Sequence, residues 1–387
     1  MNALPMMVDR DLEQRVRAAL DDLRAGKMLI LVDDEDRENE GDLVCAGELV
    51  TPDHIRFMME HARGEFCLSV GGHKADALQL ALQVSDPTSP RSTAFTVTID
   101  ARAGGTGVSA ADRALTCRTA SRPDCRPEDL VRPGHIHPLR ARDGGVLVRT
   151  GHTEGSVDLM TLAGLQPSAV IIEVVKANGD MARLPDLEQL AKDHNLRILT
   201  IADLVAYRLM HESLVKLVAD GDVQTRWGTF RACVFEGVVD QREALALIKG
   251  DVRAANAPLV RVHSGAGLTD VFPGMLGDSG EKLDSALGAL AKEEAGVFLY
   301  LPQETQGMRL GAQLQAKLAA RAKGESYSGE RGPPPGNSQG MRHYGIGAQV
   351  LRSLGLSRIR LMSNNPIRLK AIHGFGLDIV DVVPIPL

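Results

Sequence analysis

A short apolar run that ends in a dense cluster of acids constrains this chain more than any other stretch. Residues 29–32, LILV, have the length and composition of a buried strand. Seven acids follow within ten residues, and only Arg37 offsets them; they are Asp33, Asp34, Glu35, Asp36, Glu38, Glu40 and Asp42. So many carboxylates at one strand end repel each other unless a cation, a basic ligand or open water takes up their charge.

Three interpretations of this cluster compete. An isolated charge run is usually a solvated loop. A calcium loop fits Asp36, Glu38 and Glu40 in its first half, but its twelfth position is Gly47, where a bidentate Glu is needed, which excludes it. The third interpretation is a hard divalent metal held by one or two acids, with other coordination positions left for substrate. That interpretation requires partners elsewhere in the chain.

Composition narrows the class of protein. A chain of 387 residues can bury the cores of two domains. The net charge of −6 and an aromatic content of 3% argue against a nucleic-acid partner. No apolar run reaches membrane-spanning length, and the first residues do not resemble a signal peptide. Five cysteines without paired metal spacing fit a reduced, cytoplasmic protein.

Alternating strand and helix patterns predict the α/β (α+β) class, with two domains, 1–207 and 208–387, each a mixed sheet covered by helices. Helices are predicted at 12–26, 51–62, 187–194, 201–210 and 344–354. Strands are predicted at 29–32, 66–70, 94–100, 146–148, 169–175, 197–200, 230–238, 257–263, 296–300 and 358–362. Residues 208–229 are expected to connect the two halves.

A glycine-rich turn, residues 104–113, enters a helix with Ser109 near its start. Backbone N–H groups and the helix dipole make such a turn a reasonable phosphate cradle. It matches neither the Walker motif nor GxGxxG, and glycine-rich turns are mostly structural, so this signal is weak by itself.

Two histidine-bearing segments follow. In residues 132–139, RPGHIHPL, prolines bracket His135 and His137 in what we expect to be a rigid loop. The second segment follows the predicted strand 146–148 and contains Arg149, His152, Thr153 and Glu154. A single His is more often structural than a ligand, but this grouping around glycines at a strand end favours a metal or phosphate role.

Glu173 lies inside the predicted apolar strand 169–175. An acid in that setting is costly unless it is paired or functional, and its pKa would be raised by burial. Glu173 is therefore a candidate proton carrier.

Several motifs together resemble 3,4-dihydroxy-2-butanone 4-phosphate synthase of riboflavin biosynthesis: DDEDRENEGD, TAFTVTIDA, TGVSAADRA, RPGHIHPLRA and GGVLVRTGHTEGSVDLMTLAG. This resemblance extends through about Tyr207. The second half resembles GTP cyclohydrolase II through RVHS, GVFLYLPQE, YGIGAQVL, SNNP and GFGLDIVDVVP.

The resemblance implies conversion of ribulose 5-phosphate into dihydroxybutanone phosphate and formate, with Mg²⁺ or Mn²⁺ on Glu38 and His152. It implies catalytic roles for His135 and Glu173, to which the acid–base chemistry adds Asp42. The expected substrate contacts are Arg37, Glu38, Asp42, Arg149, Thr150, Gly151, His152, Thr153 and Glu173. In the chemistry we expect, the metal chelates the C2 and C3 oxygens of the sugar. Arg37, Arg149 and the 104–109 turn then neutralise its phosphate.

One departure lies in this half. The family's usual HVFPL reads HIHPL here, so His137 replaces an aromatic residue. We expect this replacement to alter packing more than chemistry.

The second half departs from its family where chemistry would occur. The family's zinc-binding segments, SECLTGD and RCDCGE, read SGAGLTD and LGDSGE, so the three cysteine positions become Ala266, Gly277 and Ser279. Gly340 also replaces an acid two residues before Arg342. The pattern QEGRG reads QETQG. Because zinc activates the water that opens the purine ring, we predict no zinc and no cyclohydrolase activity.

Alternatives remain for the second half. It could hydrolyse GTP through a substitute metal site at His263, Asp278 or Glu281. It could instead sense GTP or a flavin, with Arg342 and the 363–366 turn as contacts, or stabilise a dimer. The synthase resemblance itself implies a homodimer with sites near the subunit interface.

Overall fold

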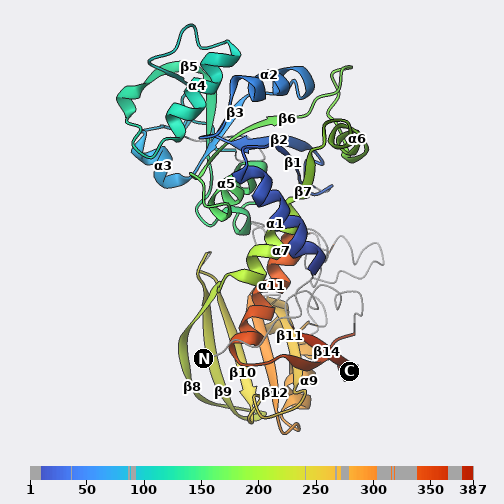
Figure 1. Cartoon of the computed structure of the whole chain (residues 1–387). Helices are drawn as coiled ribbons and strands as arrows, with labels where there is room; N and C mark the ends of the chain where they lie inside the picture. Colours follow the sequence, from blue (N-terminus) through green and yellow to red (C-terminus); the bar gives the residue numbers. More distant parts are fainter. Residues whose placement is uncertain are drawn as a thin grey trace. The chain divides into compact units, whose positions relative to one another are not determined.

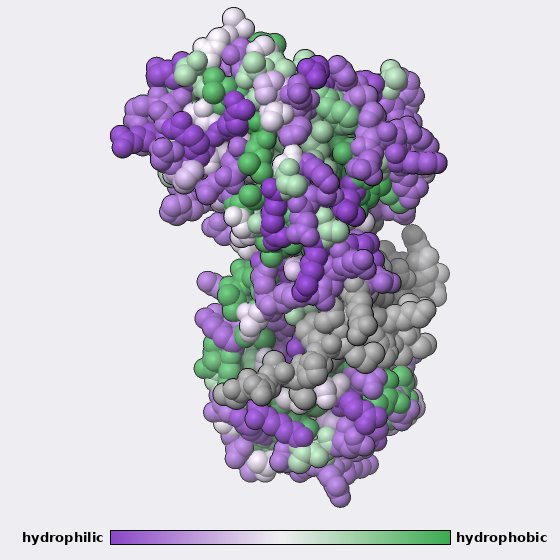
Figure 2. Space-filling model, in the orientation of Figure 1, coloured by the Kyte–Doolittle hydropathy of each residue, from purple (hydrophilic) through white to green (hydrophobic). Residues whose placement is uncertain are grey.

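The computed structural model describes residues 10–35, 37–85, 88, 93–239, 241–265, 268–271, 279–302, 315, 318, 338–364 and 377–386. The chain divides into two compact units, of which one is Asp9–Tyr207 and the other contains Arg208–Leu387 (Figure 1). No helix in the described ranges has both the length and the apolar character needed to cross a membrane. Hydrophilic residues cover most of the visible face of the first unit (Figure 2).

The described part of the first domain contains a mixed sheet of seven strands in the order β4-β5-β3-β6-β2-β1-β7. The strands are β1 (Leu29–Val32), β2 (Gly41–Ala46), β3 (Cys67–Val70), β4 (Ile99–Ala101), β5 (Leu130–Arg140), β6 (Ser168–Glu173) and β7 (Arg197–Thr200). The pairs β1–β7 and β3–β5 are parallel, and the other neighbours are antiparallel. This mixed sheet confirms the predicted fold class.

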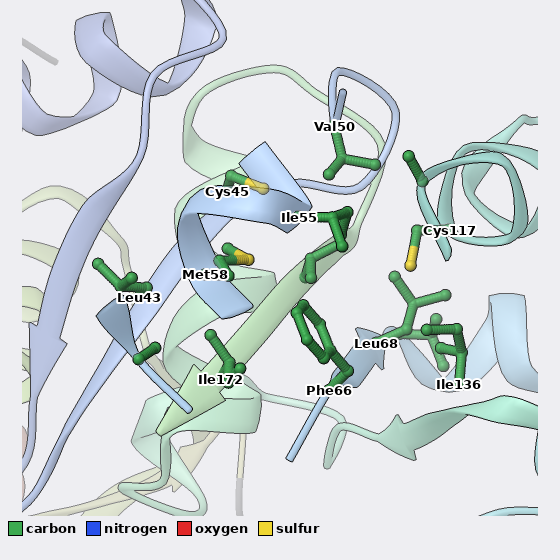
Figure 3. Packing of buried hydrophobic residues seen from close by; sticks show 14 of the residues in the cluster. Leu43, Cys45, Val50, Ile55, Met58, Phe66, Leu68, Cys117, Ile136 and Ile172 are labelled. Atoms are coloured by element: carbon green, nitrogen blue, oxygen red, sulfur yellow. The ribbon is translucent and has the colours of Figure 1, made fainter. Parts of the chain in front are cut away.

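Helices cover both faces of this sheet, as the period of two along its strands requires. They are α1 (Arg10–Arg24), α2 (Pro52–His61), α3 (Gly72–Ala77), α4 (Ala110–Ser121), α5 (His152–Leu162), α6 (Leu184–His194) and α7 (Ile201–His211). Ile30 and Leu43 belong to a core that includes buried residues of α2, α4 and α6. Figure 3 shows Leu43 and Met58 among the side chains gathered in that core. Leu31, on the opposite face, lies against Gly155 of α5.

Local chemistry explains where α2 begins. The Thr51 hydroxyl accepts a hydrogen bond from the His54 N–H, and Pro52 occupies the first helical turn. This arrangement satisfies an otherwise unpaired amide at the helix start and confirms the start predicted from the Thr-Pro pair.

Two predicted segments are wrong in type. Residues 132–139 are not a loop but part of β5, which pairs with β3 on one side and with β4 on the other. Residues 146–148 are not a strand. Gly144 and Gly145 have positive φ values and turn the chain into a 3-10 helix, Gly145–Leu147.

Two predicted strands have different bounds. Of residues 94–100, only the end pairs regularly, in β4. Strand β6 stops at Glu173 instead of continuing to residue 175, so this acid lies at the end of the strand and not in its middle.

The second domain, by itself, contains a mixed sheet in the order β14-β13-β11-β12-β10-β9-β8 among its described residues. Its strands are β8 (Val215–Thr225), β9 (Gly228–Gly237), β10 (Glu243–Lys249), β11 (Leu259–Gly265), β12 (Gly296–Pro302), β13 (Arg358–Met362) and β14 (Asp378–Val383). Its helices are α8 (Leu268–Val271), α9 (Ser279–Leu290) and α11 (Ser338–Ser353). Residues 208–229, expected as a plain connection, hold the end of α7 and all of β8. Sequence analysis did not find β8, β10 or β14.

Strand β12 separates α9 from α11. Phe298 packs in a cluster with Leu287 and Leu290 of α9. Leu299 and Leu301, which alternate with it, lie against Gly347 of α11. The helices therefore cover opposite faces of the sheet, in agreement with the predicted architecture.

Candidate active site

The acidic segment folds back on itself between β1 and β2. Asp33 is buried, and its two carboxylate oxygens accept hydrogen bonds from the backbone N–H groups of Glu40 and Glu38. The Arg37 guanidinium lies 2.7 Å from Asp33 and 2.6 Å from Glu38. Burial by itself would lower the pKa of Arg37, but the negative charges of Asp33 and Glu38 raise it by more. The pKa of Arg37 is therefore above its ordinary value, and the side chain stays charged.

Three side chains converge where a metal ion could be held. Ligand atoms of Asp33, Glu38 and His152 all lie within 4.8 Å of one another. His152 is the first residue of α5, and its Nδ1 lies 3.9 Å from Glu38. Burial lowers the pKa of His152, so the ring is neutral and retains a lone pair for a metal. Its Nε2 is buried without a hydrogen-bond partner among the described residues.

Asp42 and Glu173 are neighbours across the β2–β6 pair. Burial, Glu173 and Glu38 raise the pKa of Asp42 well above the ordinary aspartate value. One oxygen of Asp42, Oδ1, is buried with no hydrogen-bond partner in the described part of the chain, and it lies 3.9 Å from His152. The two acids therefore extend the metal-ligand cluster across the neighbouring ends of β2 and β6, two central strands of the sheet.

Two guanidinium groups approach the start of α5. A Cβ at Gly151 would lie 2.3 Å from Arg149 Nη1 and 3.0 Å from Arg37 Nη2. Arg149 also contacts Glu154 at 2.6 Å and donates a hydrogen bond to the Thr93 hydroxyl. Two cations beside the N-terminus of an eleven-residue helix favour an anionic ligand there.

Thr150 and Thr153 flank this position. Thr153 is buried in the first turn of α5, and Thr150 is half-buried just before it. The structure thus brings together the predicted contacts on the acidic segment and on residues 149–153.

His135 lies apart from this cluster within one chain, because β3 and β6 separate its strand, β5, from β2. Asp100 holds it: His135 Nδ1 lies 2.7 Å from Asp100 Oδ2, and the His135 backbone N–H donates to Oδ1. A proton on Nδ1 leaves Nε2 as an acceptor. A Cβ at Gly107 would lie 2.2 Å from Asp100 and 2.5 Å from His135, so this pair needs a glycine there.

The predicted phosphate cradle at 104–109 is occupied by the chain itself. Ser109 caps α4 as expected, but Asp112 accepts hydrogen bonds from the Gly105 N–H at 2.7 Å and from the Ser109 hydroxyl at 2.9 Å. An internal carboxylate thus takes the place where an anion would bind. This corrects the expectation that the turn neutralises a phosphate.

Sequence reasoning missed the roles of three acids. Asp33 was counted in the acidic run but not chosen as a ligand, Glu154 as a partner of Arg149 was not foreseen, and Asp100 was not considered. Asp33 directly follows the apolar run, and this position at a strand end was the available signal. The pairing of Asp100 with His135 spans 35 residues and left no local signal.

The sequence analysis placed three residues where the family has zinc-binding cysteines: Ala266, Gly277 and Ser279. Of these, Ser279 lies among the described residues, whereas Ala266 and Gly277 lie outside them. The Ser279 hydroxyl donates to Asp270 Oδ1 at 2.5 Å, and His263 Nε2 lies 3.0 Å from the same oxygen. The Tyr300 hydroxyl donates to Asp270 Oδ2 at 3.0 Å. Burial and Asp270 raise the pKa of Tyr300 to about 12, so it remains a donor.

Gly265 makes room for this arrangement. It occupies the position of the glutamate in the family's SECLTGD pattern, and a Cβ there would lie 2.3 Å from the Tyr300 hydroxyl oxygen. We call Asp270, His263, Ser279 and Tyr300 the Asp270 network.

Known proteins match both halves. The family model of 3,4-dihydroxy-2-butanone 4-phosphate synthase matches residues 17–207, and that of GTP cyclohydrolase II matches residues 216–384. A riboflavin biosynthesis protein RibBA from Aquifex aeolicus is 46% identical, covering 96% of this chain and 92% of the relative. A RibBA from Bacillus cytotoxicus is 44% identical, covering 96% and 94%.

A solved structure matches over both domains. The crystal structure of RibBX, a two-domain 3,4-dihydroxy-2-butanone 4-phosphate synthase from A. baumannii, has a TM-score of 0.79 and 37% identity, covering 95% of this chain and 99% of that one. This chain belongs to the family of riboflavin biosynthesis proteins that join a 3,4-dihydroxy-2-butanone 4-phosphate synthase domain to a GTP cyclohydrolase II domain.

Proposed function

We propose that residues 1–207 convert ribulose 5-phosphate into 3,4-dihydroxy-2-butanone 4-phosphate and formate, with Mg²⁺ or Mn²⁺. The observation that carries this proposal is the convergence of Asp33, Glu38 and His152 beside the orphaned oxygen of Asp42. Five buried free cysteines support a reducing, cytoplasmic setting.

The donor set suits a hard divalent cation. Carboxylate oxygens are the preferred ligands of Mg²⁺ and Mn²⁺, and a neutral imidazole is acceptable to Mn²⁺. When bound, such an ion polarises the sugar oxygens and stabilises negative charge that develops on them. Glu38 and His152 would hold it, with Asp33 orienting Arg37 and the loop.

Asp42 and Glu173 are suited to move protons. Burial and the neighbouring acids raise the pKa of Asp42 well above that of an ordinary aspartate, which suits it to donate a proton to a departing hydroxyl. Glu173, its neighbour across the sheet, then serves as the acceptor. Arg37 and Arg149 bind the phosphate beside Gly151, which anchors the substrate at a fixed distance from both acids.

We also propose a homodimer in which one copy's His135 serves the acidic cluster of another. The separation of His135 from that cluster within one chain supports this arrangement. Mixing inactive His135→Ala and Glu38→Gln proteins would then restore part of the activity, because one site of a mixed dimer has both residues. No recovery after subunit exchange would contradict site sharing.

We propose that residues 208–387 do not hydrolyse GTP. Ser279 offers a hydroxyl instead of a thiolate, and that hydroxyl is committed to Asp270. His263, a candidate for a substitute zinc site, is fully buried and engaged by the same carboxylate, while Glu281 is exposed. These contacts argue against a reassembled zinc site among the described residues.

Formate release by the full-length protein tests both proposals. Ribulose 5-phosphate and GTP would be supplied separately, with magnesium present and zinc added or withheld. We expect formate from the sugar phosphate only. Release from GTP would overturn the second proposal, and no release from ribulose 5-phosphate with either metal would overturn the first.

A further inference from the structure

A pocket in the first domain is lined in part by the candidate catalytic residue His135. Its volume is about 540 Å³, and its lining includes His135, His137, Glu65 and Ile172. Ile172 directly precedes Glu173 in β6. The pocket therefore extends from His135 to the residue that precedes Glu173.

His137 faces Glu65 in this pocket. Its Nδ1 lies 2.6 Å from Glu65 Oε1, and the two side chains are 29% and 57% exposed. This contact is an ion pair when the imidazole ring carries a proton on both nitrogens. The aromatic residue of the family pattern could not make this contact.

Glu65 in turn contacts Glu173 through its backbone. The Glu65 N–H donates to Glu173 Oε2 at 2.9 Å. A Cβ at Gly64 would lie 2.4 Å from the Glu173 carbonyl oxygen and 2.7 Å from Oε2. The Gly64–Glu65 backbone therefore lies directly against Glu173, and the Glu65 N–H binds one of its carboxylate oxygens.

We propose that His137 and Glu65 act together as positioning residues for Glu173. His137 holds the Glu65 side chain, and the Glu65 backbone holds the Glu173 carboxylate in the orientation used for proton transfer. The replacement of an aromatic residue by His137 thus acts on the chemistry of this site as well as on its packing. This inference deepens the proposed synthase function and rests on the role assigned there to Glu173.

The test compares Glu65→Gln, His137→Phe and the double variant in formate release from ribulose 5-phosphate. We expect kcat to fall about tenfold in each single variant, because a small misplacement of a catalytic group is costly. KM should change less than about twofold, since Arg37 and Arg149 hold the phosphate. The double variant should be no slower than the slower single variant, because the two residues act as one unit.

Two further variants separate positioning from packing. His137→Asn places an amide N–H near the position of Nδ1 and should retain most of kcat, unlike His137→Phe. Glu60→Gln is the matched control: Glu60 is an exposed glutamate on α2 whose carboxylate lies 3.9 Å from His61. It should behave as the wild type.

Each outcome decides the inference. Wild-type kcat in Glu65→Gln, additive losses in the double variant, or equal losses in His137→Asn and His137→Phe would overturn it. A joint change of kcat and KM with a fall in Tm would indicate a purely structural role and also overturn it. If the wild type itself releases no formate, the proposed function fails first, and this inference falls with it.

Discussion

Each domain buries an aspartate beside a histidine near a strand end, but the two aspartates differ in what surrounds them. Asp42 is near Glu173 and Glu38, and its Oδ1 has no hydrogen-bond partner among the described residues. Asp270 receives hydroxyl hydrogens from Ser279 and Tyr300 and is also within 3.0 Å of His263. The described residues provide no hydrogen-bond donor to Asp42 Oδ1, whereas both oxygens of Asp270 accept hydrogen bonds from side chains of the protein.

This difference is the physical basis of our proposal that the first cluster binds a cation and the second does not. Buried negative charge without donors is costly, and a divalent ion removes that cost when it binds. Donors supplied by the protein remove the same cost without an ion. In the second cluster the Ser279 hydroxyl is one such donor, and Gly265 leaves space for a second donor, Tyr300.

Glu38→Gln should break the first cluster most severely. The variant keeps the shape of the side chain but removes the charge that would hold the metal, so formate release from ribulose 5-phosphate should fall about 10³-fold. Binding of Mn²⁺, followed by calorimetry, should weaken in parallel. Glu35→Gln is the control, since Glu35 is an exposed acid of the same segment. Full activity in Glu38→Gln would refute the metal assignment.

Asp42→Asn should lower kcat by about 10²-fold, in line with the loss of a general acid. The same change should stabilise metal-free protein at neutral pH. Burial raises the pKa of Asp42 in the folded state above 3.8, its ordinary value. Between these two pKa values the folded protein binds more protons than the unfolded chain, so the stability of the wild type falls as the pH rises from one to the other.

The gain in unfolding free energy should be about 1.4 kcal/mol for each pH unit by which the pKa is raised. Urea unfolding in EDTA at several pH values would measure it. Wild type and Asp42→Asn should be alike below pH 3.8 and diverge above it. If Asp42→Asn is no more stable than the wild type at neutral pH, then the charge of Asp42 is not costly in the folded protein, and the contrast with Asp270 is wrong.

Ser279→Ala should weaken the second cluster without affecting synthase turnover. It removes a hydrogen bond to a buried carboxylate, which should lower the unfolding free energy of this domain by about 1.5–3 kcal/mol. Ser285→Ala, on the same helix, is the matched control. Denaturant unfolding would give the difference, and equal stability of the two variants would remove the Asp270 network as a source of stability.

The smallest expected effect is that of zinc on the thermal stability of the second domain. Because the Asp270 network needs no metal, addition of zinc or treatment with a chelator should move the Tm of the second domain by less than about 1 °C. A rise in Tm with zinc, together with stoichiometric zinc by elemental analysis, would show that the second cluster also binds a metal and would refute the proposed difference between the two clusters.

Local patterns predicted much of the fold. The apolar run 29–32, the Thr51 cap and the start of α4 at Ser109 all depend on neighbours within a few residues, and all are present. The predictions for residues 132–139 and 146–148 were wrong. The first segment pairs with strands far along the chain, and the positive φ values of Gly144 and Gly145 turn the chain before the second, so both override local preference.

The sequence by itself determined the family, the crowding of acids after the first strand, and the loss of thiols at Ala266, Gly277 and Ser279. These depend only on which residue types stand at which positions. Tertiary structure alone decided that Asp33 lies beside Glu38 and His152, that Asp112 fills the glycine-rich turn, and that Asp100 holds His135. It also assembled the Asp270 network from four elements. Hydrogen bonds and burial depend on distances in space, and those distances exist only once separate segments have packed together.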